Sequence, residues 1–146
     1  RKVADLFAGC GTFTLPLAKA SAVTAYEGDS DAVDALKEGA KHAQGLKPIT
    51  VERRDLFRRP LLQSELEAFD AIVLDPPRAG AKTQCEHLAQ AKVKRVVMAS
   101  CSPATFARDA SLLIAGGFRL ERVLPVDQFL WSSHIELVAH FAKKRL

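Results

Sequence analysis

The stretch VADLFAGCGTFTLPLA, residues 3–18, is the part of the sequence that decides the fold. It begins with an apolar run typical of a buried strand, passes through a turn that contains Gly9 and Gly11, and continues as a helical pattern. Glycines in such a turn allow the backbone to approach a ligand closely, and the N–H groups of the following helix then point at that ligand. The stretch therefore predicts a strand–turn–helix unit with a binding site at the turn.

Further along the chain, short apolar runs alternate with helical patterns. The predicted strands are Lys2–Phe7, Val23–Glu27, Ile49–Glu52, Ala71–Asp75 and Arg95–Ser100. The predicted helices are Phe13–Lys19, Asp31–Gln44, Lys82–Ala91 and Ala104–Ala115. Repeated alternation of this kind is typical of an α/β domain in which helices cover both faces of a parallel sheet.

The pattern changes near the end of the chain. FRLERVLPVD (residues 118–127) and HIELVAHFA (residues 134–142) are both strand-like, and no helical pattern separates them. Since parallel neighbours need a long crossover, we expect the last strand to run antiparallel to its neighbours. A mostly parallel, seven-stranded sheet with an antiparallel last strand resembles the Rossmann-like fold of class I S-adenosylmethionine-dependent methyltransferases.

Acidic residues follow the ends of successive predicted strands. Asp5 lies just before the glycine turn, Glu27 ends the second strand, and Asp55 follows the third. An acid at the end of the second strand can accept the hydroxyls of a ribose, and Asp55 falls where an adenine amino group could be met. One such acid alone is usually a solvated residue, but three around a glycine turn favour a nucleoside ligand.

The turn differs from the dinucleotide fingerprint G-x-G-x-x-G, because Thr14 stands at the third glycine position. Its D-x-F-x-G-x-G pattern instead resembles the first motif of methyltransferases. The ammonium group of S-adenosylmethionine would also give Asp5 a partner that NAD does not supply. We therefore predict S-adenosylmethionine as the cofactor. The predicted cofactor-binding residues here are Asp5, Phe7, Gly9, Gly11, Glu27 and Asp55.

A cysteine stands between a predicted strand and a predicted helix in VVMASCSPATFARD, residues 96–109. Ser102 is a suitable N-cap and Pro103 a suitable first helical residue, so Cys101 would face a helix N-terminus. The positive end of a helix dipole favours a thiolate. The alternative is a small buried apolar residue, since free cysteines are often buried. The local sequence leaves both interpretations open.

Composition limits the other classes. The 146 residues have a net charge of +4, which permits a nucleic-acid partner, and no apolar run approaches the roughly 20 residues of a membrane span. The three cysteines (Cys10, Cys85 and Cys101) cannot all pair and lack metal-site spacing, so we expect no metal site and a reducing cytoplasm. We interpret the basic stretch ERRDLFRRP, residues 52–60, as a solvated loop rather than a phosphate-binding site.

Three further blocks carry a specific resemblance. DPPRAG (residues 75–80) is followed, after a gap of 15 residues, by VVMASCSPAT (residues 96–105), and then by DQFLWSSHIE (residues 127–136). Together with the first motif, these blocks resemble the RNA (uracil-5-)-methyltransferase family, whose members methylate C5 of uridine in transfer or ribosomal RNA. Met98, Ser102, Leu130 and Ser132 depart from the family pattern, which usually has Tyr, Asn, Pro and Thr there.

The resemblance implies a role for five residues. The family's nucleophile corresponds to Cys101 and its general base to Glu136, which fits a reaction in which a thiolate adds to C6 of uracil and a base later removes the C5 proton. Asp75 would contact the target base or the cofactor. Arg78 would meet RNA phosphate or hold its turn, and His134 would orient the base or the uracil.

The resemblance also sets the expected organisation. We expect residues 1–146 to form a single catalytic domain, without the N-terminal RNA-binding region that family members carry. RNA, either rRNA or tRNA, is the expected partner of a cytoplasmic monomer that has no membrane contact and no stable protein partner. Two alternatives stay open: a nucleic-acid methyltransferase that does not use Cys101, and a non-catalytic domain that binds the cofactor or RNA.

Overall fold

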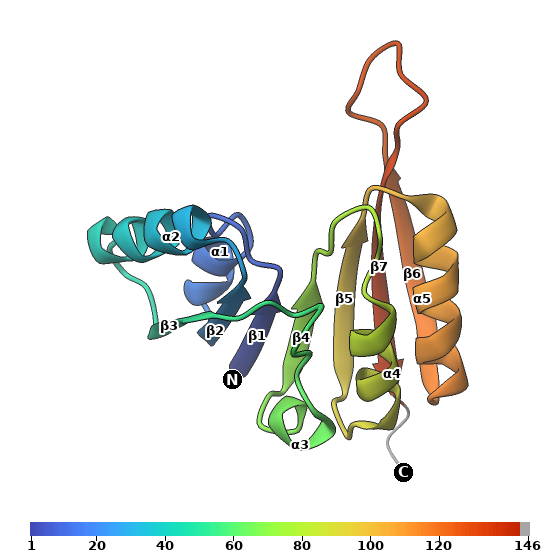
Figure 1. The fold of residues 1–146 in the computed structure, drawn as a ribbon, viewed down its shortest axis with the longest axis horizontal. Coiled ribbons are helices and arrows are strands. Elements are labelled where there is room, and N and C mark those ends of the chain that lie inside the picture. The colour runs from blue at the N-terminus through green and yellow to red at the C-terminus, as the bar shows by residue number, and fades with distance from the viewer. Residues whose placement is uncertain (144–146) are drawn as a thin grey trace.

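Figure 1 shows the fold in a computed structural model, which describes residues 1–143. The strands are β1 (Lys2–Leu6), β2 (Ala22–Glu27), β3 (Ile49–Arg53), β4 (Ala71–Leu74), β5 (Arg95–Ser100), β6 (Phe118–Val126) and β7 (Glu136–Lys143). The helices are α1 (Thr14–Ala18), α2 (Ser30–His42), α3 (Gln63–Leu66), α4 (Lys82–Gln90) and α5 (Pro103–Ala115). The strands form one seven-stranded sheet in the order β3-β2-β1-β4-β5-β7-β6.

The sheet is parallel from β3 to β5, and β7 runs antiparallel to both of its neighbours, β5 and β6. This confirms the predicted fold class and the predicted direction of the last strand. The reason is the connection between β6 and β7, residues 127–135, which contains no helix. A parallel pair needs a crossover of about a dozen residues or more, so this link can join only antiparallel strands.

Helices cover both faces of the sheet. Successive residues of β2 point to opposite faces, because side chains alternate along a strand. Ala25 packs with Leu36 of α2, whereas Tyr26 belongs to the larger core that includes Leu88 of α4 and Leu113 of α5. Helices α4 and α5 therefore lie on the opposite face from α2, and in Figure 1 they lie side by side in front of the C-terminal half of the sheet.

The predicted elements all occur, with ends that shift by at most a few residues, and α3 is the one element that the sequence did not predict. It has four residues, too few to show a helical period. Contacts at its two ends stabilise this helix. At the start, the Leu62 N–H donates to Glu65 Oε2 at 2.8 Å, and at the end the Leu66 side chain is buried. No helix within residues 1–143 is long and apolar enough to cross a membrane.

The β6–β7 connection projects from the body of the molecule (Figure 1). We call residues 127–135 the projecting loop. It leaves the sheet at the edge where the parallel strands end, because β7 begins there and runs back in the opposite direction. The loop is therefore next to the site that the sequence predicts.

Candidate active site

The topology gathers the predicted site residues at one edge of the sheet. Chain order runs outward from β1 to β3 and then returns to β4 on the other side of β1, so a crevice opens between β1 and β4 at their carboxyl ends. The acids and the cysteine come from six strands or their ends: Asp5, Glu27, Asp55, Asp75, Cys101 and Glu136. Glu136 reaches the same edge because it is the first residue of an antiparallel strand.

The glycine turn after β1 has an unusual backbone. Phe7, Gly9 and Gly11 all have positive φ angles, of 62°, 55° and 99°. A Cβ on Gly11 would lie 2.4 Å from Leu36 Cδ1, so this position has no side chain because α2 packs against it. A Cβ on Gly9 would meet no atom within 4 Å. Gly9 therefore lines open space, which a ligand can approach closely.

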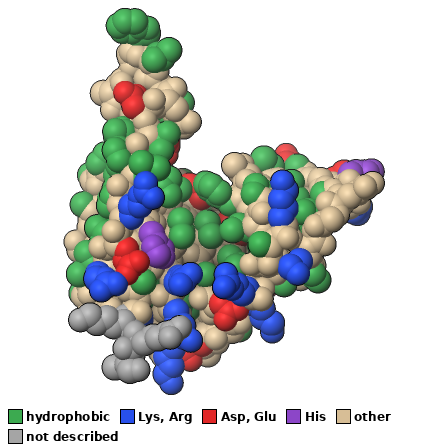
Figure 2. Space-filling view, turned by 180° about the vertical axis from the view of Figure 1, so that it is seen from behind, with side chains coloured by type: hydrophobic (Ala, Val, Ile, Leu, Met, Phe, Trp, Pro, Cys, Tyr) green, Lys and Arg blue, Asp and Glu red, His purple; other side chains and the backbone are tan. Residues whose placement is uncertain are grey.

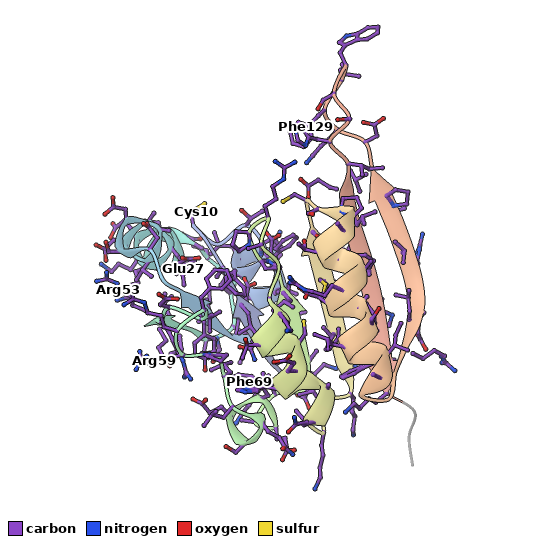
Figure 3. The ribbon with its side chains drawn as sticks, turned by 45° about the vertical axis from the view of Figure 1, so that its right-hand side comes forward. Cys10, Glu27, Arg53, Arg59, Phe69 and Phe129 are labelled. Atoms are coloured by element: carbon purple, nitrogen blue, oxygen red, sulfur yellow. The ribbon has the colours of Figure 1, made fainter. Side chains whose placement is uncertain are left out.

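Glu27 ties the turn to the end of β2. Its carboxylate accepts hydrogen bonds from the backbone N–H groups of Gly9, Gly28 and Asp29, at 2.8, 2.7 and 2.8 Å. A carboxylate offers about four acceptor sites. One site therefore remains for a ribose hydroxyl, and a second hydroxyl would have to share or replace a backbone donor. Figure 3 shows Glu27 beside Cys10 in the N-terminal half of the molecule.

Asp5 is a buried acid with one unsatisfied oxygen. Its side chain is fully buried, and Oδ2 accepts a hydrogen bond from Thr14 Oγ1 at 2.5 Å. Among the described residues, nothing donates a hydrogen bond to the buried Oδ1. Burial raises the pKa of Asp5 to about 6, against the Thr14 bond, and the nearby charges of Asp75 and Glu27 add to the rise. The buried Oδ1 therefore lacks a donor among the described residues, and an ammonium group would supply one.

Asp5 predicts a pH dependence of stability. The folded chain binds this proton more tightly than the unfolded chain, whose Asp pKa is near 3.8, so the ligand-free protein loses stability as the pH rises from about 4 to about 6. The shift corresponds to about 3 kcal/mol. We measure the thermal unfolding midpoints of the wild type and of Asp5→Asn. The difference, wild type minus variant, should decrease as the pH rises over this range. An equal pH profile for the two proteins would contradict the assignment.

Ligand affinity should change in the opposite direction. An ammonium-bearing ligand needs the ionised Asp5, so S-adenosylhomocysteine should bind about tenfold more weakly at pH 5 than at pH 7, since pH 5 is one unit below the pKa of about 6. Titration calorimetry measures this directly. Asp5→Asn should bind weakly and equally at both pH values, and a wild-type affinity that does not change with pH would refute the contact.

A cavity of about 430 Å³ lies next to these acids. Its lining residues are Phe7, Glu27, Gly28, Arg54, Asp55, Leu56, Phe57, Asp75, Pro76 and Pro77. The rings of Phe7 and Phe57 are 5.3 Å apart between centroids, and Asp55 is oriented by the N–H groups of Phe57 and Arg58, at 3.0 and 3.2 Å. Aromatic walls with acids at the rim suit a nucleoside. Together with the unsatisfied Asp5 oxygen and the open space at Gly9, this cavity fits S-adenosylmethionine.

A second cavity, of about 700 Å³, contains both predicted catalytic residues. Its lining residues are Arg78, Cys101, Gln128, Phe129, Leu130, Ser132, His134 and Glu136. In the antiparallel ladder Ser100 pairs with Leu137, so the next step beyond the ladder brings Cys101 opposite Glu136. The register of β5 and β7 therefore explains why a thiol and a carboxylate that lie far apart in the sequence share one cavity.

The turn at Cys101 is held by Ser100. Ser100 Oγ accepts from the Ser102 N–H at 3.2 Å and donates to the Ser102 carbonyl at 3.1 Å. Ser102 is the N-cap residue of α5 and Pro103 its first residue, as predicted, but the Ser102 side chain makes no capping hydrogen bond. Ser102 therefore occupies the predicted N-cap position without the side-chain hydrogen bond that usually favours serine there. The preceding serine instead fixes the turn that exposes part of Cys101.

Two carboxyl groups, those of Asp75 and Glu136, interact electrostatically across the crevice. Burial raises the pKa of Asp75, and the charge of Glu136 raises it further. Asp75 lines the smaller cavity and Glu136 the larger one, so the two cavities are neighbours. At the mouth of the larger cavity, Arg78 Nη2 lies 3.3 Å from His134 Nδ1. These two residues, predicted to contact substrate, therefore contact each other.

Helix α5 holds the Asp75–Gly80 loop through contacts that the sequence did not predict. Asp109 is buried and accepts from the Ala81 N–H at 2.6 Å and from Arg108 Nε at 2.8 Å. Arg108 donates to the Ala79 carbonyl at 2.9 Å, and Thr105 Oγ1 donates to the Arg78 carbonyl at 3.0 Å. Because α5 starts just after Cys101, these bonds set the position of the loop relative to the thiol.

Loss of the Asp109 contacts should be costly. Asp109→Ala leaves the Ala81 N–H unpaired in a buried position and releases Arg108, so we expect the free energy of unfolding to fall by about 3 kcal/mol in chemical denaturation. Ser111→Ala is the matched control on the same helix, since Ser111 bonds only to the Ala107 carbonyl at the surface, and should change stability by less than about 0.5 kcal/mol. Equal effects of the two changes would show that Asp109 does not hold the loop.

One part of the basic stretch differs from the prediction. Arg53, Arg58 and Arg59 are exposed, as expected for a solvated stretch, but Arg54 is largely buried. Its guanidinium forms a two-pronged ion pair with Glu65, at 2.7 and 3.0 Å, and also donates to the Pro60 carbonyl. Arg54 therefore holds the β3–α3 connection beside the smaller cavity, because a planar fork of donors can bind a carboxylate and a carbonyl together.

Comparison with known proteins identifies the family. Residues 1–144 match the tRNA (uracil-5-)-methyltransferase family. The chain belongs to this family. The match confirms the resemblance that the four motifs predict.

Several curated relatives of this tRNA (uracil-5-)-methyltransferase family member carry related names. An uncharacterised RNA methyltransferase of Rhizobium meliloti is 57% identical over 98% of the chain. The 23S rRNA (uracil(1939)-C(5))-methyltransferase RlmD of Alteromonas mediterranea is 38% identical over 99% of the chain. The match covers 34% and 30% of these two proteins, so the chain spans about a third of their length.

Solved structures agree with the fold. The tRNA (uracil-54, C5)-methyltransferase of Pyrococcus abyssi, in complex with S-adenosyl-L-homocysteine, superposes with a TM-score of 0.84 at 28% identity. That match covers 97% of this chain and 34% of the archaeal one. Magnesium protoporphyrin IX methyltransferase of Synechocystis, with a TM-score of 0.73 at 19% identity over 97% of this chain and 69% of that one, shares the fold.

Proposed function

We propose that this chain transfers a methyl group from S-adenosylmethionine to C5 of a uridine in RNA through a covalent bond between Cys101 and C6 of the uracil. The observation that supports this most strongly is the larger cavity, in which Cys101 and Glu136 are the thiol and the carboxylate that the reaction needs. The nucleoside-sized cavity lies beside it, with Asp75 at its rim. A methyl donor and a target base can then meet at the crevice between the two.

The smaller cavity would hold the cofactor. Glu27 would accept a ribose hydroxyl through its remaining acceptor site, Asp55 would face the adenine amino group, and the free oxygen of Asp5 would accept from the ammonium group. Phe7, on the wall, would pack against the adenosine. When bound, S-adenosylmethionine supplies a sulfonium-activated methyl group. The protein contributes the orientation of that group toward the neighbouring cavity.

Cys101 would perform the activation. C5 of uracil is a weak nucleophile, and addition of the Cys101 sulfur to C6 forms a C–S bond while the electron pair of the C5=C6 bond moves to C5 and its neighbouring carbonyl. C5 would then bond to the methyl carbon as the methyl–sulfur bond of the donor breaks, which leaves S-adenosylhomocysteine. Cys101 lies directly before the first residues of α5, and the addition uses its thiolate form. The Cys101 side chain is partly exposed, so a uracil ring can reach its sulfur.

Glu136 would complete the reaction. After methylation, C5 carries both the methyl group and its original hydrogen, and the carboxylate of Glu136 takes this hydrogen as a proton. The electron pair of the C5–H bond then restores the C5=C6 bond and the C6–S bond breaks, which returns the Cys101 thiolate. Every bond formed during activation is therefore accounted for, and no oxidant or metal is needed.

Asp75, Arg78 and His134 would contact the substrate. The raised pKa of Asp75 lets its carboxyl keep a proton more readily and donate a hydrogen bond to a carbonyl oxygen of the uracil or to the cofactor. Arg78 is exposed at the cavity mouth, where it can meet an RNA phosphate, and its contact with His134 orients both side chains. The target uridine would have to leave its stack to enter the cavity.

The proposal also covers the RNA substrate, the cellular compartment and the oligomeric state. We propose RNA, either tRNA or rRNA, as the substrate of a cytoplasmic monomer that needs no stable protein partner. Names of relatives point to both kinds of RNA, since one family member acts on tRNA and another on 23S rRNA. The three free cysteines are consistent with a reducing compartment.

Release of the C5 hydrogen tests the proposed reaction. RNA transcribed with 5-tritiated uridine is incubated with the protein and S-adenosylmethionine, and the tritium released to water is compared with the methyl groups incorporated. We expect one tritium for each methyl group, because only methylation at C5 removes this hydrogen. Methyl incorporation without tritium release would indicate another position. Cofactor binding without either product would indicate a non-catalytic binding domain.

A further inference from the structure

The projecting loop carries the two most exposed of the large apolar side chains in residues 1–143. Trp131 is fully exposed, with a relative accessibility of 104%, and its neighbours Leu130 and Phe129 are exposed by 86% and 45%. Figure 2 shows hydrophobic side chains at the end of the projection, away from the body of the protein. Contiguous exposed apolar side chains of this size are uncommon unless they bind something.

The backbone at the tip is also unusual. Trp131 has a φ of 62°, one of only two positive φ angles at non-glycine residues among the described residues, and the other is Phe7 in the cofactor turn. A bulky residue in this region costs free energy, and such costs are concentrated at ligand-binding segments. A tight turn, closed by the Ser132 N–H donating to the Phe129 carbonyl at 3.2 Å, holds the indole outward.

The loop is continuous with the candidate catalytic cavity. Phe129, Leu130 and Ser132 line that cavity together with Cys101 and Glu136, and Trp131 follows directly in the chain. In Figure 3, the ring of Phe129 leaves the lower part of the loop on the side toward Cys10 and Glu27. An occupant of the cavity would therefore contact the projecting loop close to Trp131.

The charge of the loop selects among possible contacts. Residues 127–135 contain no lysine or arginine, and Asp127 is their only residue with a fixed charge. A segment without cations gains nothing from phosphates and is poorly suited to an anionic membrane surface, which favours basic residues beside apolar ones. Flat aromatic rings without charge do suit the faces of unstacked nucleobases, on which such rings stack.

We propose that the projecting loop is a base-stacking element, in which Trp131 stacks on an unpaired nucleobase next to the target uridine. This inference rests on the proposed function, because it takes RNA as the occupant of the adjoining cavity. It assigns the loop the task of holding the strand open beside the flipped uridine. Stacking would tolerate any base at that position, so Trp131 would contribute affinity for single-stranded RNA rather than sequence specificity.

The sequence provides a direct probe, since Trp131 is the only tryptophan of the chain. The ligand is a single-stranded RNA of about ten nucleotides with one central uridine, a length within the usual range for such sites. A second RNA of the same length lacks the two bases that flank the uridine. Indole emission is recorded during titration without methyl donor, and the affinity of a fluorophore-labelled copy of each RNA is measured by anisotropy.

We expect the intact RNA to quench the indole emission and the abasic RNA to leave it nearly unchanged. Trp131→Ala should weaken binding of the intact RNA about tenfold, Trp131→Phe should restore most of it, and neither change should affect the abasic RNA. The losses in RNA-binding free energy caused by removing the indole and by removing the two bases are then not additive. Such non-additivity identifies a direct contact between them. Ile114→Ala removes an exposed side chain from α5, outside the cavity lining, and should bind like wild type.

Several results would overturn the proposal. They are absence of RNA binding, equal binding by Trp131→Ala and wild type, or equal quenching by the two RNAs. A change in emission that follows protein concentration without RNA would make the tip a contact between copies of the chain. Indole quenching reports RNA contact at the loop tip, whereas tritium release reports methylation at C5. Quenching without tritium release would therefore refute only the proposed reaction, and normal release with full affinity of Trp131→Ala would refute only the stacking.

Discussion

Replacement of Cys101 by alanine should reduce methyl transfer to RNA by about 10⁴-fold or more, the scale seen when a covalent nucleophile is removed. The reason is chemical, because without addition at C6 the C5 atom of uracil stays too weak a nucleophile to take the methyl group. Cys101 lines the larger cavity and does not line the smaller one, so S-adenosylhomocysteine should bind the variant normally. Initial rates of methyl incorporation and calorimetric affinity measure the two effects separately.

Cys85→Ala is the matched control for this change. Cys85 is also a free cysteine, but its side chain is fully buried in the main core and its thiol pKa is raised by burial. Its loss should lower stability slightly and leave the methylation rate of the folded protein unchanged. A Cys101→Ala protein that methylates RNA at the wild-type rate would eliminate the covalent mechanism, and the alternative of a methyltransferase that does not use Cys101 would replace it.

Replacement of Glu136 by glutamine should stop the reaction at a later point. The amide cannot take the C5 proton, so the thiolate cannot leave and the methylated RNA should stay bonded to Cys101. We expect turnover to fall by about 10²–10⁴-fold, the range for loss of a general base, while a protein–RNA adduct accumulates on unmodified RNA. Denaturing gel electrophoresis and mass spectrometry of the adduct detect this state.

Glu121→Gln controls for the loss of a carboxylate. Glu121 lies on β6, where it pairs with Arg119 and approaches His140, and it does not line the catalytic cavity. This variant should turn over normally and form no stable adduct. If Glu136→Gln lost activity without accumulating an adduct, Glu136 would act before the methyl transfer rather than after it.

The fold could be predicted from the sequence because each part of it has a local signature. Glycine at 9 and 11 marks the first turn, and the apolar runs that become β1, β2, β4 and β5 have helical patterns between them. The direction of β7 followed from the absence of a crossover before it. Only α3 was missed, because a helix of four residues shows no period and depends on the Leu62–Glu65 contact for its start.

The candidate site was only partly predictable. Motifs identified which residues belong together, but the pairing register that brings Cys101 opposite Glu136 is a tertiary property. The roles of Arg108 and Asp109 were invisible for the same reason, since an Arg-Asp pair on a helix resembles a solvated face until the Gly80 turn packs on it. The glycine at position 80 was the one sequence feature that pointed to this packing. A Cβ there would lie 2.5 Å from the side chains of Arg108 and Asp109.

Arg54 and Trp131 show what composition and motifs cannot predict about a side chain. Arg54 is one of four arginines in a short basic stretch, and only the position of Glu65 separates it from its solvated neighbours. Trp131 belongs to a motif that the resemblance covers, yet its full exposure and positive φ angle are visible only in three dimensions. Charge patterns and motifs predict which residues are present at a site, whereas packing decides which of them contact one another.

The covalent bond between Cys101 and uracil C6 is the central claim, and trapping with 5-fluorouridine tests it most directly. The protein is incubated with S-adenosylmethionine and with tRNA and 23S rRNA transcripts that contain 5-fluorouridine. Fluorine at C5 cannot leave as a proton does, so the reaction should stall with the methylated ring attached to the enzyme. We predict an adduct that survives denaturation, requires the methyl donor and maps to Cys101 by mass spectrometry. Methylation of unmodified transcripts without any adduct on the fluorinated ones would contradict the claim.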